Sequence, residues 1–204
     1  HHKGDEVLRG ISQILLTILG PEDIAARYGG EEFAVILPER DEEETIAIAE
    51  KIRTVIEETH FSGEQYQPGG KLTVSIGYST YPDKAGNELE LINSADDAMY
   101  RAKFFNKNRV ERYVSILEDL RKDINEEHLE LLTSIKTLIS VINAKDRYTY
   151  SHVERVVLYC RLIAERLGLS EEDKDKLILG AYMHDVGKIN IPEEILVKKT
   201  PMIE

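Results

Sequence analysis

The spacing of apolar residues changes near residue 114, and this change divides the chain into two differently built parts. Before that point, segments with helical periodicity alternate with short strand-like segments, whereas afterwards only helical periodicity remains. Alternating helices and strands are typical of an α+β or α/β sandwich, and helices alone indicate an all-α unit. The 204 residues can form one large domain or two small domains. We therefore expect an α-β sandwich domain over 1–114, a long helix over 115–143 and an all-α domain over 144–204.

The first part is predicted to contain three helices and four strands. Apolar residues at steps of three and four predict the helices, and short segments of strand-like pattern, two of them joined by a Gly-Gly turn, predict the strands. The expected helices span 6–19, 41–59 and 89–105, and the expected strands span 24–30, 31–39, 71–81 and 108–114. Gly29 and Gly30 join the first two strands, a spacing that favours a hairpin.

Two carboxylates follow the glycines of this hairpin. A turn of small residues allows a ligand to approach the backbone closely, so a polyphosphate could accept N–H bonds from Gly29 and Gly30. Glu31 and Glu32 offer the oxygen ligands that Mg²⁺ prefers. The same pattern also fits a solvated turn that binds nothing.

Charge and composition exclude several classes of protein. The net charge of −12 and the pI near 5.1 argue against binding to a nucleic-acid polymer or an anionic membrane, although a local site for phosphates is compatible with them. The sequence shows neither a signal peptide nor an apolar stretch of the roughly 20 residues that span a bilayer. With Cys160 as the single cysteine, we expect a cytoplasmic protein without membrane contact.

The segment 115–143 has an apolar stripe along one helical face. Its steps of three and four are those of a coiled coil or a long bundle helix. The segment is either a helix packed on its own domain or a linker helix that pairs two chains into a homodimer. The stripe comprises Leu117, Leu120, Ile124, Leu131, Ile135, Leu138 and Ile142, with His128 in the remaining position.

The last part contains candidate metal ligands. His184 and Asp185 are adjacent, and neutral imidazole with carboxylate suits Fe, Mn or Zn. A single histidine on an apolar helix face, such as His152, is more often a structural residue than a metal ligand. Lys188 is the second residue of a Gly-Lys pair that could contact a phosphate.

Four ordered motifs in residues 1–114 resemble the GGDEF family of diguanylate cyclases. They are "HHKGDEVLR", "ARYGGEEFAVILPE", "LTVSIGYS" and "ADDAMYRAKFFNKNRV". The resemblance implies a nucleotide-cyclase-like fold that makes cyclic di-GMP from two molecules of GTP. Two copies of the domain must face each other to form the symmetric product, so the resemblance also implies a homodimer.

The same resemblance implies roles for individual residues. Asp5 binds the guanine edge, while Gly29 and Gly30 accommodate the GTP phosphates. Glu31 binds Mg²⁺ beside the reacting hydroxyl, and Glu32 is a second metal or base candidate. Lys103 and Lys107 meet the phosphate tail, on one helical face if the helix continues that far. The family's first strand, with a further metal-binding aspartate, would precede His1, so we expect this segment alone to be inactive.

The motifs "DRYTYSHVERV" and "YMHDVGKINIPEEIL" resemble the HD phosphohydrolase superfamily, and within it the HD-GYP branch of cyclic di-GMP phosphodiesterases. By this resemblance His152, His184 and Asp185 bind metal, and Lys188 approaches the scissile phosphate. Further ligands of the family would follow Glu204. An alternative from another class is a regulatory module that senses GTP without cyclising it and is coupled to an HD phosphohydrolase.

Overall fold

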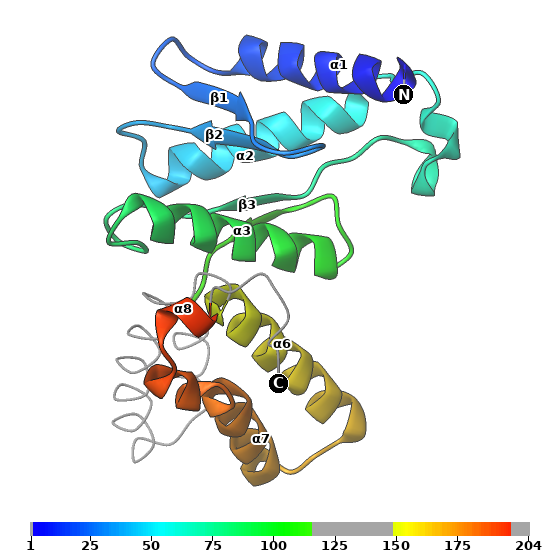
Figure 1. Ribbon diagram of the computed structural model, residues 1–204. Helices are drawn as coiled ribbons and strands as arrows, with labels where there is room; N and C mark the ends of the chain where they lie inside the picture. Colours follow the sequence, from blue (N-terminus) through cyan, green and yellow to red (C-terminus); the bar gives the residue numbers. More distant parts are fainter. Residues whose placement is uncertain (1, 116–148, 197–204) are drawn as a thin grey trace. The chain divides into compact units, whose positions relative to one another are not determined.

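The computed structural model describes residues 2–115 and 149–196. The chain divides into two compact units, His1–Tyr113 and Val114–Glu204 (Figure 1). The apolar stripe expected over 115–143 lies, apart from residue 115, outside the described residues.

The first unit has the predicted order of three α-helices and four strands within its described residues. The helices are α1 (His2–Ile18), α2 (Glu42–Glu58) and α3 (Glu88–Phe104), with short 3₁₀ turns η1 (Glu64–Tyr66) and η2 (Pro68–Gly70). The strands are β1 (Ile24–Arg27), β2 (Phe33–Ile36), β3 (Ile76–Tyr78) and β4 (Val110–Arg112). This order confirms the mixed character expected of the first part.

The strands pair in two separate two-stranded sheets in the described part of the chain. β1 and β2 are antiparallel and end at the pair Arg27 and Phe33, which leaves the glycine turn between them. β3 and β4 are parallel, and α3 provides the crossover that parallel strands require. The strands expected over 71–81 and 108–114 were too long, because the ladder joins only three residues of each strand, from Ile76–Val110 to Tyr78–Arg112.

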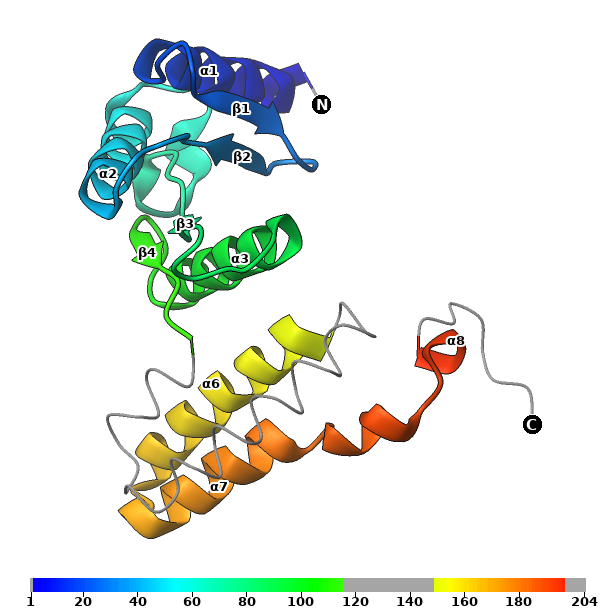
Figure 2. The ribbon, with the colours of Figure 1, turned by 90° about the vertical axis from the view of Figure 1, so that its left-hand side faces the viewer.

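A single apolar cluster holds the helix pair α1 and α2 together. Residues of both helices are buried in it with Phe61, and Phe33 and Val35 of β2 pack against it. Figures 1 and 2 show the β1–β2 hairpin next to this helix pair. The buried members are Ile11, Leu15, Ile52, Ile56 and Phe61.

The C-terminus of α3 lies one residue before its predicted end and decides whether Lys103 and Lys107 share a helical face. The helix ends at Phe104, and the next segment, Asn106 to Asn108, has positive φ angles of 78°, 57° and 46°. L-residues cannot continue a right-handed helix in this region. Lys107 therefore does not share a helical face with Lys103, and its position depends on this left-handed segment.

The second unit is helical throughout its described residues, as the sequence predicts. It contains α6 (Thr149–Leu167), α7 (Glu171–Met183), the 3₁₀ helix η3 (Val186–Asn190) and α8 (Glu193–Leu196). α6 and α7 pack through a buried cluster of Val153, Val157, Ile178, Ala181 and Tyr182. Among the described helices, none is both long and apolar enough to cross a bilayer.

Tyr78 links the second sheet to α2 and makes the first unit sensitive to alkali. Its hydroxyl donates to Glu42 at 3.1 Å, and Arg112 pairs with the same carboxylate. Burial and this hydrogen bond raise the pKa of Tyr78 from 10.0 to about 12. The folded state thus keeps the phenol proton to higher pH than the unfolded state, so this contribution is present below pH 10 and is lost as pH rises to about 12.

We expect Tyr78→Phe to abolish this part of the pH dependence. Thermal unfolding between pH 9 and pH 12, followed by circular dichroism, should show a steeper fall for the parent chain than for the variant. Tyr66→Phe is the control, because Tyr66 is exposed. Parallel curves for the parent and Tyr78→Phe would contradict the assignment.

Candidate functional sites

The turn between β1 and β2 is held by backbone bonds and by one arginine. The N–H groups of Tyr28 and Gly29 donate to the Glu32 carbonyl at 2.8 and 3.2 Å. The Arg27 guanidinium donates to the Gly29 carbonyl at 3.1 Å and to the Gly30 carbonyl at 2.5 Å. These bonds occupy the turn's carbonyl groups and fix its shape.

The two glycines differ in what surrounds them. A Cβ at Gly29 would lie 3.1 Å from Oε2 of Glu32, whereas a Cβ at Gly30 would have no atom within 4 Å. Neither residue has the positive φ that favours glycine. Neither steric crowding nor backbone conformation therefore requires glycine at position 30. The close approach of a ligand to the backbone would require it.

A basic side chain from α3 reaches this turn. Lys103 Nζ lies 3.6 Å from Oε1 of Glu32, and both side chains are 43% exposed. An exposed pair at this distance contributes little stability, so an anionic ligand can replace the carboxylate at small cost. The pair places one cation and one carboxylate beside the glycines.

The other predicted residues of this site lie at separate places in the first unit. Asp5 is exposed in the first turn of α1, Glu31 is exposed in the turn itself, and Lys107 is exposed in the left-handed segment after α3. In residues 2–115, none of these three side chains forms a hydrogen bond or ion pair with the turn.

The structure brings three predicted metal ligands of the second unit together. Donor atoms of His152, His184 and Asp185 all lie within 4.8 Å of one another. The two histidine Nε2 atoms are 3.3 Å apart, and Oδ2 of Asp185 lies 3.3 Å from Nε2 of His184. α6 supplies His152, His184 is the C-cap of α7, and Asp185 lies between α7 and η3.

The local backbone sets the tautomer of His184. Its Nδ1 lies 2.6 Å from the Ala181 carbonyl, which can only accept, so Nδ1 carries the proton. Nε2 then presents a lone pair toward His152 and Asp185. A backbone partner of this kind is the usual second contact of a metal-binding histidine.

The charges of the cluster fit a divalent metal. Oδ2 of Asp185 is buried and accepts no well-aligned hydrogen bond, although Lys188 Nζ forms an ion pair with it at 2.8 Å. Two imidazole nitrogens and one carboxylate oxygen are ligands that suit Mn, Fe or Zn. The residues present therefore fit a metal, and Lys188 is a cation beside it.

Arg27 is a residue of the turn that the sequence analysis missed. Its guanidinium contacts both glycine carbonyls. The available signal was a basic residue at the last position of the strand before the turn, but an arginine there is equally common on an exposed face.

Family profiles match both parts of the chain. The profile described as "Diguanylate cyclase, GGDEF domain" matches residues 1–109. The profile described as "HD domain" matches residues 149–204.

Individual proteins are similar to the first part. A probable diguanylate cyclase of Escherichia coli K12, DgcT, is 37% identical over 110 residues, which are 54% of this chain and 24% of that protein. The diguanylate cyclase DosC of the same strain is 38% identical over 117 residues, which are 57% of this chain and 25% of that protein. The chain thus spans about a quarter of the length of these curated relatives.

One solved structure is similar at the level of the fold. It is the active GGEEF domain of a diguanylate cyclase from Vibrio cholerae, with 29% sequence identity and a TM-score of 0.51. The match covers 56% of this chain and 71% of that one. It supports a GGDEF-like fold for the first part.

Proposed function

Because the chain belongs to the GGDEF family, whose profile matches residues 1–109 of its 204, we propose that it is part of a cyclic di-GMP signalling protein and binds GTP at the Gly29–Gly30 turn. The observation that best supports this site is the combination of a sterically unexplained Gly30 with the Lys103–Glu32 contact beside it. A triphosphate that lies over the turn would approach the backbone at Gly30. It would also replace the Glu32 carboxylate as the ion-pair partner of Lys103.

The residues of the first unit then have distinct tasks. Lys103 and Lys107 neutralise the phosphate tail, and Asp5 accepts hydrogen bonds from the guanine edge. Glu31, and Glu32 where it does not act as the base, would hold Mg²⁺, which when bound supplies positive charge to the reacting phosphate. In the cyclase reaction the 3′ oxygen of one GTP bonds to the α-phosphorus of another, and pyrophosphate leaves. Glu32 is the candidate base for the hydroxyl proton.

The pentapeptide at the turn favours an active cyclase. Residues 29–33 read GGEEF, the letters that name the active domain from Vibrio cholerae. A module that senses GTP without turnover would bind GTP but release no cyclic di-GMP, so product analysis of a protein that carries the whole GGDEF domain separates the two functions. Two copies must meet in a cyclase, and we propose a homodimer in the cytoplasm, where GTP is available.

We further propose that the His152–His184–Asp185 cluster binds a divalent transition metal for hydrolysis of a phosphodiester, with cyclic di-GMP as the substrate of an HD-GYP-type site. When bound, the metal would polarise the phosphate and supply an activated water. Lys188 forms an ion pair with Asp185 and would pair with a phosphate oxygen of the substrate instead. His184 is kept in the required tautomer by Ala181.

We expect Lys103→Ala to weaken GTP binding by about 1 to 2 kcal/mol, because a charge-assisted contact to phosphate is lost. Calorimetric titration with GTP and Mg²⁺ measures this change, and ATP measured in parallel tests the guanine role of Asp5. Lys51→Ala is the matched control, since it removes the same charge from an exposed position on α2. Unchanged affinity in Lys103→Ala, or equal affinity for GTP and ATP in the parent chain, would contradict the proposed site.

A further inference from the structure

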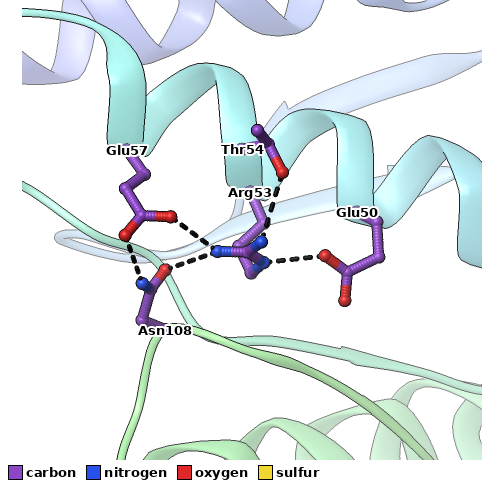
Figure 3. A network of polar contacts seen from close by, with 5 residues as sticks. All are labelled: Glu50, Arg53, Thr54, Glu57 and Asn108. Carbon is purple, nitrogen blue, oxygen red and sulfur yellow. Dashed lines mark hydrogen bonds and ion pairs between the residues drawn. The ribbon is translucent and has the colours of Figure 1, made fainter.

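Arg53 of α2 is the centre of a polar network that reaches a segment 55 residues away. Its guanidinium donates to Glu50 at 2.8 Å, to Glu57 at 2.8 Å and to Thr54 at 3.2 Å. A further bond of 3.0 Å goes to Oδ1 of Asn108 (Figure 3). The Asn108 amide in turn donates to Glu57 at 2.9 Å. Both ends of the Asn108 side chain are therefore tied to α2.

Asn108 is the last residue of the left-handed segment that contains Lys107. Three consecutive non-glycine residues with positive φ are unfavourable, by about 1 kcal/mol or more for Lys107 and by less for the two asparagines, which tolerate this region better than other L-residues. Such a conformation persists only where its surroundings hold it. Bonds from Phe105 N–H to Arg101 and from Lys107 N–H to Ala102 secure its helix side. The Arg53 network secures its other side, just before β4.

The charges of the network exclude Arg53 itself as a phosphate ligand. Arg53 is paired with two carboxylates, and only 18% of its side chain is exposed. The hydrogen bond from Arg53, followed by that from Asn108, lowers the pKa of Glu57, so this carboxylate is ionised at neutral pH. Two anions and one cation repel a triphosphate. The network can act on a nucleotide only through the segment it holds.

We propose that Arg53, through Asn108 and Glu57, is a positioning residue that holds segment 106–108 so that Lys107 meets the triphosphate of the bound nucleotide. This inference rests on the proposed GTP site. Lys107 lies beyond the end of α3, where its own N–H bond to the Ala102 carbonyl ties it to the helix on one side. The Arg53–Asn108 link fixes the segment on the other side.

Two glycine substitutions in the same segment test the proposal. Asn108→Gly keeps the left-handed backbone accessible but removes both bonds to α2. Asn106→Gly introduces the same residue at a left-handed position, where the side chain is exposed and outside the network. Arg53→Ala removes four hydrogen bonds at once and therefore tests stability as well. The asparagine pair is the sharper comparison.

Two readouts are measured on the full chain: amide hydrogen exchange of residues 105–109, and the ratio of affinities for GTP and guanosine with Mg²⁺. Asn108→Gly should speed amide exchange and lower the affinity ratio about threefold to tenfold. Lys107→Ala should also lower the affinity ratio. Asn106→Gly should leave the ratio unchanged. A purely structural link would speed exchange without changing the ratio.

Each other outcome overturns a defined part of the proposal. If Lys107→Ala lowers the ratio but Asn108→Gly does not, the positioning role is wrong and the GTP site stands. If Lys107→Ala leaves the ratio unchanged, Lys107 is not a phosphate ligand and the positioning role falls with it. If the parent chain binds guanosine as tightly as GTP, the proposed function itself is wrong, and with it this inference.

Discussion

Gly77→Ala is expected to destabilise the first unit by about 3 kcal/mol, because it overpacks a backbone contact between β3 and α3. A Cβ at Gly77 would lie 2.0 Å from the Met99 nitrogen, 2.3 Å from the Ala95 carbonyl oxygen and 2.6 Å from the Ala98 carbonyl carbon. These are backbone atoms, so no side chain can rotate away. The strand and the helix would have to separate, and β3 would lose its register with β4.

Denaturant unfolding of the first unit, followed by circular dichroism, measures this change. Gly4→Ala is the matched control, because position 4 lies in α1 with no atom within 4 Å of an added Cβ. A loss below about 1 kcal/mol in Gly77→Ala would show that β3 and α3 pack less closely than described.

His184→Ala is expected to lower the affinity of the second unit for Mn²⁺ by roughly 100-fold, since a ligand and its oriented lone pair are both removed. Asp185→Asn should reduce affinity for a different reason, because it removes the anionic charge while keeping nearly the same shape.

Calorimetric titration of the full chain with Mn²⁺ tests this site without any enzymatic assay. His60→Ala is the control variant, because His60 is an exposed histidine of the first unit and pairs only with Glu64 among the described ion pairs. Equal Mn²⁺ affinity in the parent chain and His184→Ala would exclude the cluster as the metal site.

The order of elements was predictable because it depends on local patterns. α2 and α3 begin within one residue of their predicted starts, where the side chains of Asp41 and Asn87 accept N–H groups of the first turn. Strand lengths were not predictable, because a strand extends only as far as its partner does. β3 contains three residues, since only three residues of β4 pair with it.

The residues of the candidate sites could be predicted where they are close together in the sequence. The positions of residues from distant segments could be predicted only in part. The glycine turn with Glu32 and the pair His184–Asp185 could be identified from the sequence as local motifs. The positions of Lys107 and Arg53 could not, because the helix was expected to end at residue 105 and no local pattern indicates the backbone that follows it. The left-handed segment that stops it is held by a contact with α2. Such contacts depend on tertiary structure.

The measurement that tests the GTP site most directly compares stability and GTP affinity in Gly30→Ala. Position 30 has room for a Cβ and no left-handed φ, so the unfolding free energy should stay within about 0.5 kcal/mol of the parent value or rise slightly. If phosphates lie against this backbone, the added methyl group should weaken GTP binding about tenfold or more. Unchanged affinity with unchanged stability would show that GTP does not bind over the turn.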